Sequence, residues 1–463
     1  MQTLDYSLIG LYLVGLLILG FVRRLRREST TVELIVGGRM ITLPAFVATL
    51  VSTWYGGILG VGEYSYLYGL SNWLVFGVPY YLAAFLFALF LAEKARRSEV
   101  LTIPERLAQV YDNKTAVLGS VIIFLMTVPA AYVLMLGVLC EAFFGWPFWI
   151  SVTAGTLFSI VYVFLGGFRA VVRTDLFQFA LMFAGFAVLL VFLIVTYGGV
   201  DFITANVPST HLTWHGGNSG WYIATWYVIA LATLIEPAFY QRCYAARDAR
   251  TARRGIFAAI GCWAVFDCMT TSCGLYARAI LPGLSDPVAS YPALSLAVLP
   301  TGVLGLFALA LLATVMSTVD SYSFLAASTF GQDICGRLRK LNHRQVALYT
   351  RLGLFVSAGL AVAFAVFFRS AVDIWHAFGS IGTPALLVPV FFAFVGRWRL
   401  KTSHAFIMIM VSGLASGVWY LSKYTGSTGN FYLGLQPIFP GLVVSLSLFL
   451  ALARKKQGKL PDL

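Results

Sequence analysis

The sequence predicts an all-α integral membrane protein with about thirteen transmembrane helices. Hydrophobic residues make up 59% of its 463 residues and charged residues only 11%, whereas a soluble domain is usually about 45–50% apolar and about 25% charged. The apolar residues gather in runs of about 20, the length that crosses a bilayer as a helix. Alternating runs of about ten residues, which would indicate a membrane β-barrel, are not found.

Thirteen apolar runs account for more than half of the chain and exclude a large soluble domain. The first lacks the basic flank and cleavage site of a signal peptide, so we expect it to be retained as a span. The runs lie at residues 6–22, 40–70, 73–92, 115–144, 147–167, 175–196, 221–240, 255–280, 303–331, 349–368, 372–396, 403–421 and 436–453.

Lysine and arginine residues predict the orientation of the helices. All but three of the 32 basic residues fall in alternate loops on one side, including the run Arg23, Arg24, Arg26 and Arg27; the exceptions are Arg278, Arg369 and Lys423. Because cytoplasmic loops are rich in lysine and arginine, we expect the N-terminus outside and the C-terminus in the cytoplasm, in a bacterial inner membrane. The net charge of +13 therefore reflects topology, and no nucleic-acid partner is expected.

Two of the predicted helices contain residues that interrupt helices. The run 40–70 holds Pro44 and the pair Gly56–Gly57, and the run 221–240 holds Glu236–Pro237. A broken helix exposes backbone carbonyls that can bind a cation beside a cavity, although the first run could instead be one long tilted helix that packs through its small residues.

These two interrupted helices are five spans apart, which predicts an inverted repeat of five plus five helices. We expect one additional N-terminal helix and two additional C-terminal helices. The predicted parts are an N-terminal helix with a basic loop (1–39), the first repeat with helices 2–6 (40–200), the second repeat with helices 7–11 (201–396), and two C-terminal helices with a short basic tail (397–463).

Five carboxylates lie inside or beside the predicted spans, namely Glu63, Asp175, Glu236, Asp267 and Asp320. Charge inside a span is costly, so each is a functional candidate. Glu236 and Asp267 are candidates for gating or coupling. The structural alternatives are water exposure for Glu63, an N-terminal helix cap for Asp175 and a hydrogen-bonded packing role for Asp267.

The ninth predicted helix carries a cluster of side-chain oxygens. Thr314, Ser317, Thr318, Asp320 and Ser321 recur at spacings of three and four residues, which places them along one helix face. Hard cations prefer oxygen ligands, so this face is a candidate ion site. The hydroxyls could instead bond to carbonyls of their own helix.

Five motifs occur in order along the chain. They are GGR at 37–39, LTIPERL at 101–107, GGFRAVVRTDLFQ at 166–178, QRCYAARDARTARRG at 241–255 and MSTVDS at 316–321. Together they resemble the sodium/solute symporter family. The resemblance implies a leucine-transporter-like fold around a site in the middle of the membrane, and coupling to sodium ions.

The resemblance also implies a main sodium site. Its ligands would be the carbonyls of Ala48 and Val51 in the first broken helix, the carbonyl of Thr314, and the hydroxyls of Ser317 and Thr318.

Some family members have a further sodium site, and its matching positions here are Asp175, Ser317, Asp320 and Ser321. Asp320 stands where those members have serine. Two close carboxylates resist joint ionisation, so this group predicts either a second cation site or a site where a proton or a basic residue replaces the second sodium.

The solute pocket is expected beside the break in the first broken helix. The candidate lining residues are Ser52, Trp54, Tyr55, Phe76, Tyr80 and Tyr132, although aromatic residues also serve as packing or interfacial residues.

The predicted function is sodium-coupled symport of a small polar organic solute into the cytoplasm by alternating access. The expected partners are this solute and the lipid bilayer, and no obligatory protein partner is inferred. The alternatives are a proton-coupled symporter, a transporter-like sensor and a channel. The sequence has no metal-binding cluster, nucleophile elbow or phosphate loop, so an enzyme is not expected.

Overall fold

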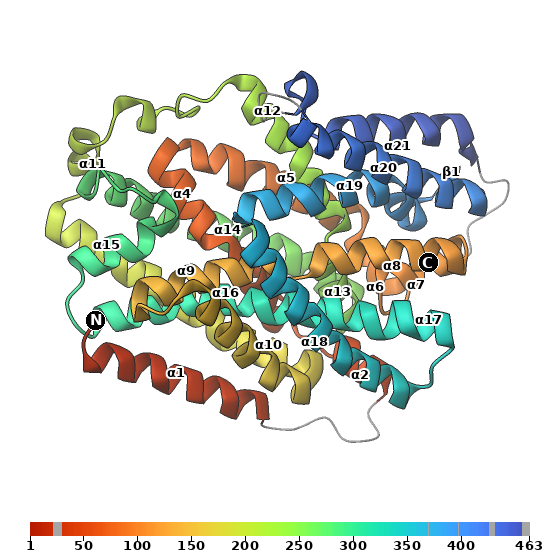
Figure 1. Ribbon diagram of the computed structural model, residues 1–463, viewed down its shortest axis with the longest axis horizontal. Coiled ribbons are helices and arrows are strands. Elements are labelled where there is room, and N and C mark those ends of the chain that lie inside the picture. Colours follow the sequence, from red (N-terminus) through yellow and green to blue (C-terminus); the bar gives the residue numbers. More distant parts are fainter. Residues whose placement is uncertain (22–29, 369, 397, 426–430, 456–463) are drawn as a thin grey trace.

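The computed structural model describes residues 1–21, 30–368, 370–396, 398–425 and 431–455, and nearly all of them are helical (Figure 1). The basic run Arg23, Arg24, Arg26 and Arg27 and the end of the basic tail at 456–463 lie outside these residues. An all-helical membrane protein is therefore confirmed for the described part of the chain.

Eleven helical segments of the described chain are long and apolar enough to cross a membrane: Thr3–Gly20, Leu43–Tyr68, Trp73–Phe90, Asn113–Phe144, Gly166–Tyr197, Gly220–Ala245, Ala249–Ile280, Val303–Arg339, His343–Phe368, Asp373–Val395 and Thr402–Tyr424. The other two predicted spans coincide with shorter apolar helices, Phe148–Phe164 and Ile438–Leu452. The total of thirteen spans stays a prediction.

Several helices of the first half begin where a polar side chain or a proline favours a start. The hydroxyl of Thr30 accepts a hydrogen bond from the Glu33 amide, and the Glu33 carboxylate accepts one from the Thr30 amide, which is a capping box. The helices are α1 (Thr3–Phe21), α2 (Thr31–Val36), α3 (Leu43–Trp54), α4 (Ile58–Tyr68), α5 (Val78–Phe90), α6 (Ala92–Arg97), α7 (Ile103–Val110), α8 (Asn113–Thr127), α9 (Ala130–Phe144), α10 (Phe148–Tyr197) and α11 (Val200–Asn206).

The second half has the same kind of helix starts, such as Asp248, which accepts a hydrogen bond from the Thr251 amide. The helices are α12 (Gly220–Ile229), α13 (Pro237–Ala245), α14 (Ala249–Ile280), α15 (Ser290–Val298), α16 (Val303–Ser328), α17 (Gly336–Arg339), α18 (His343–Phe368), α19 (Ala371–Val395), α20 (Thr402–Thr425) and α21 (Ile438–Leu452). A two-residue strand β1 (Trp398–Arg399) pairs antiparallel with β2 (Arg454–Lys455).

Both helices that were expected to be interrupted are broken. A 3-10 turn, Tyr55–Gly57, separates α3 from α4. A second 3-10 segment, Ala230–Ile235, and the extended residue Glu236 separate α12 from α13. Pro237 is the first residue of α13, where its missing amide hydrogen costs nothing. The alternative of one continuous tilted helix is therefore wrong for residues 43–68.

The predicted runs 147–167 and 175–196 leave a loop at residues 168–174 between them. This prediction is wrong, because residues 168–174 are helical. The backbone of α10 leaves the helical conformation only at Gly167 (φ 57°, ψ −156°) and is helical again from Phe168. A glycine tolerates this positive φ, so one residue suffices to change direction. Asp175 consequently lies two turns inside the second part of α10, where it cannot cap the helix.

α16 forms the centre of the bundle. Every residue from Leu304 to Ser328 is buried except Leu306. The helix α16 packs against α1, α9, α10 and α18. The basic helices α6 and α17 lie with α7 at one end of the bundle, opposite the start of α1 and the short helices α11 and α15 (Figure 1). Which end faces the cytoplasm, and where the two repeats begin and end, stay predictions.

Candidate cation site and solute cavity

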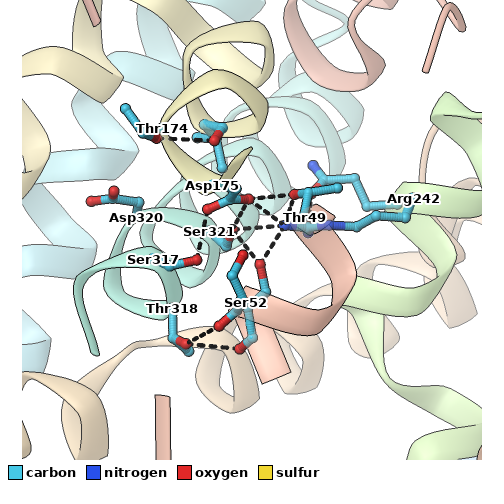
Figure 2. Close-up of polar contacts among 12 residues, drawn as sticks. Thr49, Ser52, Thr174, Asp175, Arg242, Ser317, Thr318, Asp320 and Ser321 are labelled. Atoms are coloured by element: carbon cyan, nitrogen blue, oxygen red, sulfur yellow. Dashed lines mark hydrogen bonds and ion pairs between the residues drawn. The ribbon is translucent and has the colours of Figure 1, made fainter. Parts of the chain in front are cut away.

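Hydroxyl groups of α16 meet carbonyl groups at the end of α3. The Thr318 hydroxyl donates to the Thr53 carbonyl oxygen at 2.8 Å and lies 3.5 Å from that of Ser52. These carbonyls belong to the last turn of α3, which has no complete set of helical partners. All three residues are buried, and Figure 2 shows the contacts. Oxygens at this spacing suit one hard cation.

The carbonyls of Ala48 and Val51 stay predicted sodium ligands. Among the described hydrogen bonds, none joins Ala48 or Val51 to the hydroxyls of α16, because α3 stays regular as far as Trp54 and a helical carbonyl accepts from the amide four residues later. The Thr314 hydroxyl donates to the Ala310 carbonyl of its own helix at 2.7 Å, as the structural alternative predicted for such residues. Its carbonyl remains untested as a ligand.

Asp175 receives hydrogen bonds from three hydroxyls on two helices. Ser317 donates to Oδ1 at 2.7 Å, Ser321 donates to Oδ2 at 3.4 Å, and Thr49 of α3 also donates to Oδ2. The structure therefore brings together the members Asp175, Ser317 and Ser321 of the expected second site.

Arg242 of α13 supplies the positive charge at this place. Its Nη2 lies 3.5 Å from Asp175 Oδ2, and both side chains are fully buried. The same nitrogen donates to Ser321 Oγ at 2.7 Å and to Thr53 Oγ1 at 2.8 Å (Figure 2). A guanidinium group thus occupies the position beside Asp175 where a second cation was considered.

Arg242 was not among the predicted site residues, because it directly follows the predicted run 221–240 and was therefore assigned to a cytoplasmic loop. The available signal was Pro237, which starts a helix. Arg242 lies five residues later, about one and a half helical turns into the span. Burial of a basic residue at that depth indicates a partner of opposite charge.

Asp320 is separate from this cluster. Its Oδ1 accepts a hydrogen bond from Ser159 and its Oδ2 accepts one from Tyr162, both on α10. Figure 2 shows its carboxylate directed away from Asp175 and Ser321. The expected joint site of Asp175, Asp320 and Ser321 is thus divided, because residue 320 projects from another side of α16 than residues 317 and 321.

A cavity of about 240 Å³ lies where the two broken helices meet. Five of the six predicted solute residues line it, namely Trp54, Tyr55, Phe76, Tyr80 and Tyr132. Ser52 does not line it; its side chain is fully buried.

Glu236 and Asp267, expected as gating residues, also line the cavity. Further lining residues that the sequence interpretation missed are Trp226, Thr233, Tyr322, Trp375 and Thr383.

Two broken helices around a central cavity, with an oxygen-rich cation site beside it, define a secondary membrane transporter. The family described as the Sodium:solute symporter family matches residues 34–411. The chain belongs to this family, so it is a transporter and not an enzyme, and sodium is its coupling ion.

Relatives of known function cover nearly the whole chain. The sodium/pantothenate symporter of Haemophilus influenzae is 27% identical over 95% of this chain and 93% of its own length. The osmoregulated proline transporter of Bacillus subtilis is 24% identical over 95% of this chain and 92% of its own length.

Two solved structures share the fold. A Na⁺-coupled sialic acid symporter in an outward-open state has a TM-score of 0.80 at 18% identity, covering 98% of this chain and 100% of that one. The nucleobase-cation-symport-1 family transporter Mhp1 has a TM-score of 0.56 at 11% identity, covering 90% and 95%.

Proposed function

We propose that the protein couples the inward movement of one sodium ion to the uptake of a small polar organic solute by alternating access. The contact between Thr318 and the Thr53 carbonyl carries this proposal, because it joins α16 to the end of α3. The adjoining residues Trp54 and Tyr55 line the cavity. An ion held there bridges two helices and favours the state that binds solute best.

The proposed sodium ligands are the Thr318 and Ser317 hydroxyls and the carbonyls of Ser52 and Thr53. Ser317 also donates to Asp175, so the ion would lie next to the ion pair of Asp175 and Arg242. Residues 40–200 and 201–396 would form the two inverted repeats, whose relative movement opens the cavity to each side in turn.

A stoichiometry of one sodium ion follows from the buried arginine. Its guanidinium takes the position beside Asp175, so it acts as an internal cation that remains with the protein. One sodium ion still provides substantial accumulation, because a charge moving through 100 mV releases about 2.3 kcal/mol, which corresponds to about 50-fold for an uncharged solute.

The relatives support a small organic solute. They include symporters of pantothenate and of proline, and the cavity of about 240 Å³ has the volume of about eight liquid water molecules.

Proton coupling is the second candidate, and Asp320 is the observation that favours it. This buried carboxylate contacts the hydroxyls of Ser159 and Tyr162, and no ion pair joins it to a basic side chain among the described residues. A proton is the simplest way to neutralise it.

A solute screen followed by uptake measurements tests the proposal. Purified protein is heated with members of a solute library in sodium or potassium chloride, and compounds that stabilise it only in sodium are reconstituted in proteoliposomes. We expect accumulation under a sodium gradient. Full accumulation under a proton gradient without sodium would contradict sodium coupling and favour the role of Asp320.

Replacing Gly56 by alanine is expected to weaken sodium binding about 5–150-fold, since overpacking costs about 1–3 kcal/mol. A Cβ atom at Gly56 would lie 2.3 Å from the Thr318 side chain, and the α3 end and α16 would have to separate. The sodium dependence of thermal stability measures this. Gly359→Ala is the control, because a Cβ there meets nothing within 4 Å. Wild-type sodium affinity in Gly56→Ala would contradict the proposed site.

A further inference from the structure

The described lining of the cavity at the two helix breaks has two carboxyl groups and no basic side chain that is always charged. Glu236 and Asp267 line it, and its described lining includes no lysine or arginine and a single imidazole, that of His376. Arg242 is outside the lining and is paired with Asp175. A positive partner stabilises an ionised carboxylate in a membrane interior, and the described lining of the cavity supplies no lysine or arginine for this purpose.

One oxygen of Glu236 is available to a ligand. Oε1 accepts hydrogen bonds from the Tyr322 hydroxyl at 2.9 Å and from the Ala238 amide at 3.3 Å. Among the described residues, no hydrogen bond reaches Oε2, and the side chain is only partly buried. Asp267 is more enclosed, with 3% exposure, and it accepts a hydrogen bond from Tyr81.

Aromatic rings line the same cavity as the Glu236 carboxylate. The rings of Tyr132 and Tyr322 are 5.1 Å apart, and the Trp375 ring lies 6.2 Å from that of Tyr132. The Trp54 and Tyr80 rings, which also line the cavity, lie 5.5 Å apart. Aromatic faces attract cations, and most strongly desolvated ones, so these rings can bind the alkyl groups of a cation that hydrogen bonds alone would not hold.

Two threonines line the cavity without using their hydroxyl groups. Thr233 is 1% exposed and Thr383 is fully buried, and within the described structure neither Oγ1 has a hydrogen-bond partner. Unsatisfied buried hydroxyls are uncommon and indicate a missing ligand group or water.

We propose that the solute is a small organic cation with an alkylated ammonium group, bound by Glu236 among the rings of Tyr132, Tyr322 and Trp375. This inference rests on the proposed function, because it takes the cavity to be the transport site. An anionic solute would add negative charge to a cavity that already has two carboxylates, and like charges at short range repel.

Binding of four matched compounds tests the charge requirement. The probes are choline, glycine betaine and, for each, the compound in which a carbon atom replaces the nitrogen. Calorimetry in saturating sodium chloride is expected to show choline binding at least tenfold more tightly than its uncharged analogue, and betaine more tightly than its anionic analogue. Equal affinities within each pair, tighter binding of the anion, or no binding of either ammonium compound at millimolar concentration would overturn the proposal.

A substitution then locates the charge that is responsible. Glu236→Gln keeps an acceptor for Tyr322 and is expected to lower choline affinity at least tenfold while the uncharged analogue binds as before. Glu63→Gln, the same exchange in α4 outside the cavity lining, should leave both affinities unchanged. Retained choline preference in Glu236→Gln would contradict the assignment. Tyr132→Leu provides a second variant, with the same loss of choline preference expected.

Failure of this inference is distinguishable from failure of the proposed function. Sodium should stabilise the protein against heat relative to potassium even without solute. If sodium stabilises the protein and the ammonium compounds do not bind, only the solute class is wrong. If sodium has no effect on stability or on binding, the sodium coupling itself is wrong.

Discussion

Replacing Arg242 by methionine is expected to destabilise the protein by about 3–5 kcal/mol, since it leaves a buried carboxylate without its partner. Asp175 is fully buried, and Arg242 forms its described ion pair. Thermal unfolding in detergent with potassium chloride measures the loss. The matched control is Arg247→Met, whose ion pair with Asp248 is largely exposed. Exposed pairs contribute about 0–1 kcal/mol, so a small change is expected there.

The same variant should acquire an additional sodium site. Without the guanidinium, Asp175 keeps the hydroxyls of Thr49, Ser317 and Ser321, which is a set of oxygen ligands for a hard cation. High sodium is therefore expected to restore part of the lost stability, potassium should not, and the sodium dependence of uptake should become cooperative. A variant that is as stable as the original chain in potassium would show that Arg242 does not neutralise Asp175.

Removing the α16 hydroxyls is expected to abolish sodium dependence. Hydrogen bonds to charged groups contribute about 1.5–3 kcal/mol each, so Thr318→Val should weaken sodium binding about 10–150-fold, and Ser317→Ala combined with it should weaken binding further. Valine has nearly the shape of threonine, so the change isolates the loss of the hydroxyl. Sodium-dependent thermal stabilisation and uptake provide the measurement.

Two controls make this result specific. Thr318→Ser keeps the hydroxyl and should retain most of the sodium affinity. Ser328→Ala removes a buried hydroxyl from the same helix, but that hydroxyl bonds to the Leu325 carbonyl of its own helix, so sodium binding should not change. Unchanged sodium affinity in the Ser317 and Thr318 double variant would mean that the ion binds elsewhere.

Composition and residue spacing were sufficient for the fold class and for the positions of both broken helices. The breaks were predicted from Pro44, from the pair Gly56–Gly57 and from Glu236–Pro237. Proline and paired glycines change the backbone conformation wherever they occur. The same holds for Ser317 and Ser321, whose spacing of four residues places them on one face of α16. The five aromatic residues that were proposed for the solute site line the cavity.

Other features depended on how distant helices pack. The end of the regular hydrogen bonding in α3 decides which carbonyls contact Thr318, and these are the carbonyls of Ser52 and Thr53. The separation of Asp320 from Asp175 depends on how α16 is rotated against α10, which spacing along one helix does not specify.

The sequence by itself determined a helical membrane protein with two interrupted helices and an oxygen-rich face on α16, because each of these follows from local composition and periodicity. Its motifs added the resemblance to a transporter family. Only the tertiary structure decided which charges are paired. Arg242 and Asp175 are far apart in the chain, but their side chains lie 3.5 Å from each other. Glu236 and Asp267 line one cavity, and the described lining of that cavity has no lysine or arginine. Pairing of buried charges is a property of packing between helices, because the cost of an isolated charge is met by whichever partner the fold brings into contact.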